Sequence, residues 1–221
     1  MASMVKTVLR SPIFRVCCVA VLVAVAVTGC NRANVRIPGA SLDITAQQTK
    51  YQAKNSVPAR IVVFVPTDAR SSHYGEKIAG TDWKACETDS LSGDEAKLVV
   101  QRQFVAALTE SRLFSSVATE SPVAGDFVLQ SEMRALCSHV VGFVIARAAG
   151  ISSVQVSLKR GSETLVSDKF ERVVTDDQPE YSGSQVTLIE QAMRTLISDS
   201  LRELSKNVVA RLDKDAASWK K

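Results

Sequence analysis

The stretch VQVSLK at residues 154–159 alternates apolar and polar residues without a break. A period of two sends successive side chains to opposite faces of a strand, so this stretch predicts a β-strand with one buried and one solvated face. The RGS sequence at residues 160–162 suits a turn, and residues 164–174 are the expected hairpin partner. In that partner the apolar pair at residues 165–166 is out of phase with Phe170, which indicates a bulge or a shift of register.

Two amphipathic helices are expected on either side of this hairpin. Apolar residues recur along one side of residues 189–208, enough for about five helical turns. Upstream, SGDE at residues 92–95 has the form of a capping box and opens a second helix. Further strands are expected at residues 61–65 and 127–136. The order strand, helix, strands, helix predicts the α+β class, with a mostly antiparallel sheet and both amphipathic helices packed on one of its faces.

The segment at residues 140–150 is apolar for nearly its whole length. A buried central strand or hairpin is one interpretation of such a run. The other is an exposed patch that contacts lipid or a partner protein, since large exposed apolar patches usually mark binding surfaces. In that second case Val141, Phe143 and Ile145 would make the contact and Arg147 would lie at its rim.

The N-terminus carries an export pattern. Lys6, Arg10 and Arg15 come with no acidic residue, an apolar run follows at residues 16–27, and the run closes in VTGC at residues 27–30. The run has the length of a signal-peptide core and is short of the roughly 20 residues that a membrane span needs. This pattern resembles the lipobox of bacterial lipoproteins, and an uncleaved membrane anchor is the competing interpretation.

The resemblance to lipoproteins implies cleavage before Cys30, a diacylglyceride on its sulfur and usually another acyl chain on its new amino group. Such an N-terminus anchors a protein without a transmembrane helix. Asn31 stands where an aspartate would signal inner-membrane retention, so the periplasmic side of the outer membrane is expected. The predicted organisation is a signal peptide at 1–29, a lipidated N-terminus and tether at 30–58, a single periplasmic domain at 59–214 and a polar tail at 215–221.

Charge gives no reason to expect a nucleic-acid partner. The chain has 27 basic and 23 acidic residues, and three of the basic ones lie in the predicted signal peptide. The mature protein therefore has 24 basic against 23 acidic residues, a net charge of +1. No basic run is interleaved with aromatic residues, which argues against nucleic-acid binding.

Two cysteines remain for the folded domain once the signal peptide and the lipidation site are set aside. These are Cys86 and Cys137, and we expect them to pair because thiols in an oxidising periplasm usually do. A zinc site formed with His73 and His139 is the alternative. Their spacings match none of the usual structural-zinc patterns, so no metal is expected.

No catalytic constellation is evident. The chain has no Gly-x-Ser-x-Gly elbow, no phosphate-binding glycine loop and no dinucleotide fingerprint. His73 lies near Asp68 in sequence and could act as a base oriented by a carboxylate, but a solvated loop histidine is the commoner case. We therefore expect no enzyme, no catalytic residue and no cofactor other than the covalent lipid on Cys30.

Short motifs in the domain resemble two groups of proteobacterial lipoproteins. Asp68, Arg70 and Gly75 follow the strand at 61–65 as in YajG-type lipoproteins, and LFSSV at residues 113–117 resembles a helix-end element of PqiC-like auxiliary lipoproteins of ABC-type transport systems. The second resemblance implies a lipid-anchored adaptor, accessory to lipid transport of the MCE type, with transporter subunits or phospholipid as partners. A structural or assembly factor for peptidoglycan or another envelope machine is the alternative.

Overall fold

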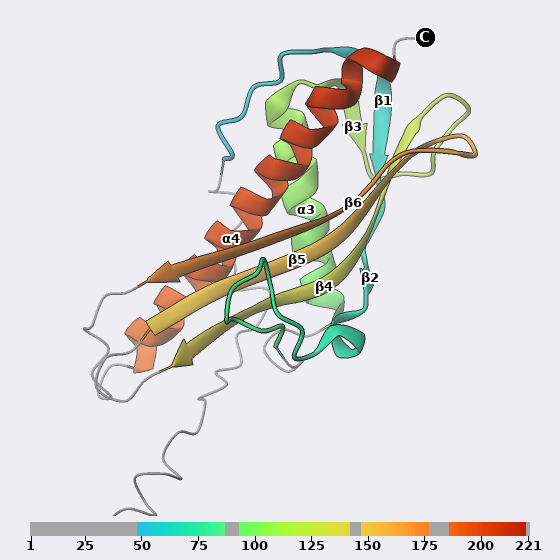
Figure 1. Ribbon diagram of the computed structural model, residues 1–221. Coiled ribbons are helices and arrows are strands. Elements are labelled where there is room, and N and C mark those ends of the chain that lie inside the picture. The colour runs from blue at the N-terminus through green and yellow to red at the C-terminus, as the bar shows by residue number, and fades with distance from the viewer. Residues whose placement is uncertain (1–47, 87–92, 142–146, 177–185, 220–221) are drawn as a thin grey trace, which may run out of the picture.

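In the computed structural model, the described residues are 48–86, 93–141, 147–176 and 186–219 (Figure 1). Within these ranges six strands form one sheet, in the order β3-β1-β4-β5-β6, and β2 pairs with β4 beside this path. The strands are β1 (Val57–Val63), β2 (Thr67–Asp68), β3 (Phe114–Ala118), β4 (Phe127–Val141), β5 (Arg147–Arg160) and β6 (Glu163–Asp176). The helices are α3 (Gly93–Ser111) and α4 (Val186–Asp215), with short 3-10 turns η2 (Arg70–His73) and η4 (Ala216–Trp219).

The α+β class is confirmed, but the sheet is mixed and the prediction of a mostly antiparallel sheet is wrong. Strand β1 is parallel to both of its neighbours, β3 and β4, and β2 is parallel to β4. Strands β4, β5 and β6 follow one another antiparallel. The parallel half arises because α3 intervenes between β1 and β3, and a helical crossover brings the chain back in the same direction.

The predicted hairpin is β5 and β6, and it is confirmed together with its irregularity. Val154, Val156 and Leu158 of the alternating stretch are buried, as the period of two requires. Leu158 pairs with Val166, but the next residue of β5, Lys159, pairs with Thr164. Residue 165 is therefore the extra residue of a β-bulge. The bulge shifts the alternation of inward and outward side chains in β6, which explains the irregular pattern in the sequence.

One hydrophobic core joins both helices to the sheet. The core side chains of the helices recur at helical spacing. They are Ala96, Val99, Val100, Phe104, Ala107 and Leu108 from α3, and Met193, Ile197, Leu201, Leu204, Val208, Val209 and Leu212 from α4. Helix α4 lies along β5 and β6 and contacts α3 (Figure 1). The approach to β5 is closest at Gly150, where an added Cβ would lie 2.6 Å from the backbone nitrogen of Ile197 and closer still to the carbonyl of Leu196.

The segment just ahead of β1 is docked on the ends of both helices. The Glu110 carboxylate in α3 accepts hydrogen bonds from the backbone amides of Thr49 and Lys50, at 2.8 and 2.7 Å. Asp213 in α4 accepts from the Tyr51 hydroxyl at 2.7 Å and from the backbone amides of residues 54 and 55, both at 2.9 Å. Residues 49–58, which the sequence suggested as part of a tether, therefore belong to the folded domain, and residues 30–47 lie outside the described ranges.

The predicted polar tail also differs from what the structure has. Trp219 is buried and stacks on Phe114, with ring centroids 6.5 Å apart, and lies against Phe127 at 5.8 Å. Arg160 donates a hydrogen bond to the Trp219 carbonyl. The folded domain thus extends beyond residue 214 to Trp219, because an indole ring in this position covers the end of the core.

Among the described helices, none has the length and apolar character needed to cross a membrane.

Candidate functional site

The loop between β2 and α3 folds back on the sheet and is held there covalently. Cys86 in the loop and Cys137 in β4 form a disulfide with Cα atoms 6.1 Å apart, which confirms the predicted pairing. Ahead of the disulfide the loop makes a small hairpin, in which Lys77 bridges to Lys84 and the Ala85 amide donates to the Glu76 carbonyl at 2.8 Å. The loop is therefore held to the sheet by the disulfide and stiffened by its own hairpin.

This loop covers the face of the sheet that lies opposite the helices. On β4, Met133 and Leu136 belong to the main core shared with the helices, whereas Ala135 and Cys137 belong to a second, smaller core. A register shift between Met133 and Ala135 separates the two parts of the strand. The second core consists of Ile78, Ala85, Cys86, Ala135, Cys137, Ala149 and Ile151, with Trp83 and Val173 packed against it.

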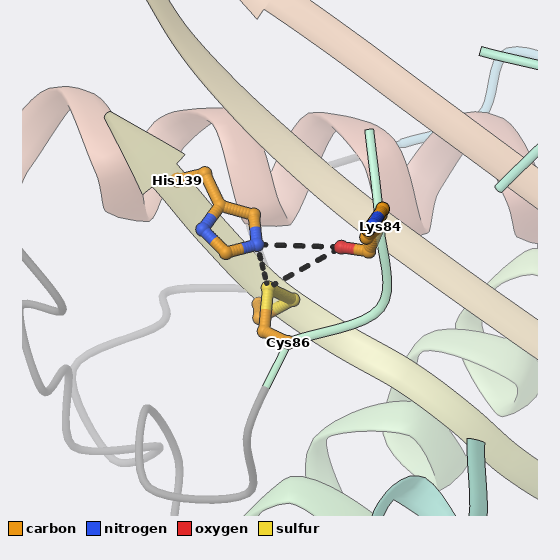
Figure 2. Close-up of a disulfide and its surroundings, with 4 residues drawn as sticks. Lys84, Cys86 and His139 are labelled. Atoms are coloured by element: carbon orange, nitrogen blue, oxygen red, sulfur yellow. Dashed lines mark hydrogen bonds between the residues drawn. A yellow bond between two sulfur atoms is a disulfide. The ribbon is translucent and has the colours of Figure 1, made fainter. Parts of the chain in front are cut away.

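His139 lies over the disulfide at the far end of β4 (Figure 2). Its Nε2 atom is 2.8 Å from Sγ of Cys86 and 3.3 Å from the backbone oxygen of Lys84. A disulfide sulfur and a carbonyl oxygen both lack a hydrogen, so Nε2 must carry the proton and donate. The imidazole also stacks on Trp83, with ring centroids 6.2 Å apart and an interplanar angle of 22°.

Three of the four residues considered for a zinc site lie close together in the structure. The side-chain ligand atoms of Cys86, Cys137 and His139 lie within 4.8 Å of one another, and among the described residues this is the group whose geometry could hold a metal ion. His73 is not a member of it. Zinc binds cysteine as thiolate, and in the disulfide neither sulfur is a thiolate, so the arrangement described here offers a metal only the imidazole.

His73 sits instead in a charged cluster on η2. Its Nδ1 is 2.9 Å from Glu76 and its Nε2 is 3.5 Å from Glu132, while Arg134 reaches Glu76 at 3.2 Å. The hydrogen bond with His73, with smaller contributions from nearby positive charges, lowers the pKa of Glu76. These pairs lie at the surface, where solvent screens the charges and weakens their contribution to stability.

The possible pairing of His73 with Asp68 is absent because Asp68 has a different partner. Its carboxylate accepts a bidentate pair of hydrogen bonds from Arg70, at 2.9 Å from Nε and 2.8 Å from Nη2. The Arg70 side chain is only 2% exposed, so this contact holds a buried charge at the start of the loop. Burial raises the pKa of Asp68, but the hydrogen bonds and the charge of Arg70 outweigh it and the pKa is lowered. The Asp-x-Arg motif is thus a structural anchor for the loop.

A cavity of about 580 Å³ opens beside His139, between the loop and the ends of three strands. Its lining residues are Thr81, Asp82, Trp83, Lys84, His139, Arg147, Val173 and Thr175. The register explains why these residues meet: His139 pairs with Ala149, Ala149 pairs with Thr175, and residues two positions apart share a face. We call this cavity the Trp83 pocket.

The structure describes only two of the four residues predicted to form a binding surface. Arg147 is exposed and lines the Trp83 pocket. Val141 ends β4 and pairs with Arg147, so the apolar run does contribute the two strands of a hairpin. Phe143 and Ile145 lie outside the described residues, as does the lipidation candidate Cys30.

Sequence reasoning missed Trp83 and Lys84 as pocket residues. Both stand in the loop, within three residues of Cys86. The available signal was an aromatic residue close to a cysteine in a polar loop. A disulfide at that cysteine fixes the neighbouring side chains against the sheet, where they can line a pocket.

No family model matches this chain, and no curated protein is similar to it in sequence. Several solved structures resemble it in shape. One is a Xanthomonas campestris protein of the DUF330 family, with 14% identity and a TM-score of 0.49 over 76% of this chain and 96% of that one. Another is a minor lipoprotein of Acinetobacter baumannii, with 11% identity and a TM-score of 0.42 over 71% and 94% of the two chains. Likeness at this level assigns neither a family nor a function.

Proposed function

We propose that this chain is a lipid-anchored adaptor of the bacterial cell envelope, attached through Cys30 to the periplasmic side of the outer membrane. The observation that carries the proposal is the placement of the cysteines. The cysteine at residue 30 closes an apolar export pattern, and the cysteines kept for the domain form a disulfide. Structural disulfides are typical of the periplasm and other oxidising compartments and are rare in the bacterial cytosol.

Within the envelope, we propose that the protein binds a partner or a small ligand and performs no chemistry of its own. The polar clusters described above support a structural role: Asp68 holds Arg70, Asp213 holds the segment ahead of β1, and His139 donates to the loop. The Trp83 pocket is the surface feature of the described residues to which we assign binding. A role as an accessory lipoprotein of an ABC or MCE-type lipid transport system suits these features.

The test of the anchor is metabolic labelling of the full chain, expressed in a Gram-negative host, with an alkyne analogue of palmitate. The wild-type chain should incorporate the label, begin at residue 30 by mass spectrometry and fractionate with the outer membrane. The variant Cys30→Ser should incorporate none, whereas Cys17→Ser, which changes a cysteine of the predicted signal peptide, should label normally. A wild-type chain that keeps residues 1–29 and takes up no label would refute the lipoprotein proposal.

The adaptor role is tested separately, by co-purifying the lipidated protein from its native envelope in mild detergent. Recovery of transporter subunits together with phospholipid, above a Cys30→Ser control, would support the transport role. Recovery of peptidoglycan enzymes without lipid would instead support a structural or assembly factor.

A further inference from the structure

We infer that the Trp83 pocket binds an amphiphile whose head carries a phosphate and whose body is apolar. This inference rests on the proposed binding role and names the class of ligand. The pocket is formed by the loop on one side and by β4, β5 and β6 on the other. Its volume of about 580 Å³ falls in the range of about 300–1,000 Å³ that small-molecule sites occupy.

The charged groups of the pocket favour an anion. Lys84 and Arg147 are both exposed cations, and they approach the pocket from different elements, the loop and the first residue of β5. The acidic residue of the lining, Asp82, is fully exposed and lies 3.4 Å from the ammonium group of Lys77, which is not a lining residue. A guanidinium and an ammonium together suit a phosphate, the first through paired hydrogen bonds and the second as a point charge.

The remaining walls favour an apolar body next to that anion. Trp83 is half-buried, with one side of its indole stacked on His139, and Val173 is packed against the same small core. An indole in such a position offers a large apolar surface at little conformational cost. A free inorganic anion would not use the apolar surface that these two side chains offer, so the shared chemistry of the lining points to a phosphate carried on an apolar chain.

The disulfide joins the two walls of the pocket. Trp83 and Lys84 precede Cys86 by three and two residues, and Cys86 is joined to β4 two residues before His139. The crosslink therefore fixes the loop wall against the strand wall. Without it, the loop side of the pocket would be held by the Lys77 to Lys84 bridge and by the packing of Ile78 and Ala85.

Fluorescence provides a local readout because the chain has two tryptophans, Trp83 and Trp219. We would reconstitute the lipidated protein carrying Trp219→Phe in phosphatidylcholine nanodiscs and titrate it with dihexanoyl phosphatidic acid. Dihexanoyl phosphatidylcholine and inorganic phosphate are titrated in parallel, and calorimetry follows the same additions. We expect a saturable change with phosphatidic acid, at least about tenfold weaker binding of inorganic phosphate, and intermediate binding of the zwitterionic lipid.

Variants then test which side chains recognise the ligand. The double change Lys84→Ala and Arg147→Ala should weaken phosphatidic acid binding by at least about tenfold, which is the effect of losing about 1.4 kcal/mol. The matched control Lys214→Ala removes an exposed cation of α4 that does not line the pocket and should leave binding within about twofold of the parent.

Three outcomes would overturn the inference. These are no saturable signal by fluorescence or calorimetry with any anion, equal affinity for inorganic phosphate and phosphatidic acid, and unchanged affinity in the double variant. Palmitate labelling at Cys30 is read independently of the pocket. The lipoprotein proposal can therefore stand when the pocket inference fails, and the titration in nanodiscs can succeed only if the pocket itself binds.

Discussion

Replacing Gly150 with alanine tests the packing of α4 on the sheet. The added methyl group would lie 2.6 Å from the backbone nitrogen of Ile197 and closer still to the carbonyl of Leu196. Real Cβ atoms do not approach backbone atoms to these distances, so α4 or β5 must move. Both elements are parts of the main core, and relief by rotating a side chain is excluded because the clashing atoms are main chain.

The expected cost follows from this geometry. Overpacking of a well-packed core typically costs about 1–3 kcal/mol, and a clash with main-chain atoms belongs at the upper end, about 3 kcal/mol. In a strand that nothing approached, the same change from glycine to alanine would stabilise by about 0.5–1 kcal/mol. The change from glycine to alanine should therefore lower the free energy of unfolding at Gly150, whereas in an unobstructed strand it would raise it.

Urea unfolding of the mature protein, followed by circular dichroism, measures the effect. With a dependence of about 2 kcal/mol per molar urea, the midpoint should fall by about 1.5 M. The control is Gly161→Ala in the β5–β6 turn, where φ is +60° and no atom lies within 4 Å of the new Cβ, so only a conformational cost of about 1 kcal/mol applies. A midpoint for Gly150→Ala that equals or exceeds the wild-type value would refute the close approach of α4 to β5.

Further changes test the crosslink and the hydrogen-bonded groups of Asp213, Tyr51 and Asp68. Changing Cys86 and Cys137 together to serine should lower the free energy of unfolding by about 4 kcal/mol, since the disulfide spans 51 residues, and reduction of the wild-type protein should give the same midpoint in urea. Burial raises the pKa of Asp213, but hydrogen bonds from the segment ahead of β1 outweigh it and lower the pKa. The stability from this carboxylate is therefore complete above the ordinary aspartate pKa of about 4 and is lost as the pH falls below it, a loss that urea midpoints should show and that Asp213→Asn should reduce. Burial and the same carboxylate raise the pKa of Tyr51 to about 12, so stability should also fall as the pH rises from about 10 to 12, and Tyr51→Phe should remove this dependence. Asp68→Asn takes the carboxylate away from a buried guanidinium, and because Asp68 itself is open to solvent the cost should be about 1.5–3 kcal/mol, measured by urea unfolding; a cost below about 0.5 kcal/mol would contradict this pairing.

The elements with a strong local pattern could be predicted from the sequence. The alternation at residues 154–159 indicated β5, and the phase error near Leu165 indicated the bulge, because both depend on the backbone period of a single strand. The helical stripes predicted α3 and α4 for the same reason. The Cys86–Cys137 pairing followed from cysteine number and the expected compartment.

The parallel half of the sheet could not be predicted in this way. Strand β3 is five residues long, FSSVA, and two of its residues are exposed serines, so its local pattern is weak. Strand β3 forms because it pairs in parallel with the edge of β1. That edge is available only once the sheet has assembled, so the local sequence does not reveal the strand. Tertiary pairing of this kind overrides local propensity.

The candidate site was only partly predictable because its residues come from four separate segments. Arg147 was identified as the rim of an apolar run and His139 as a possible metal ligand, whereas Trp83 and Lys84 were missed because their one signal was closeness to Cys86 in a polar loop. Their positions depend on the strand register and on the crosslink together. For the docked segment ahead of β1, the deciding contact joins residues about 160 apart, from Tyr51 to Asp213.

The hydrogen bonds of Asp213 and Glu110 also determine where a mechanical load would enter this molecule. Tension on the chain from the membrane side would reach the fold at residue 49 and act first on the ends of α3 and α4. Asp213 lies near the C-terminal end of α4, which is followed by Trp219 packed on Phe127, whereas the Trp83 pocket lies beside His139, toward the other end of β4. If the chain is anchored at residue 30 as proposed, a pulling force would first strain the hydrogen bonds of Glu110 and Asp213 and would not act directly on the crosslinked pocket.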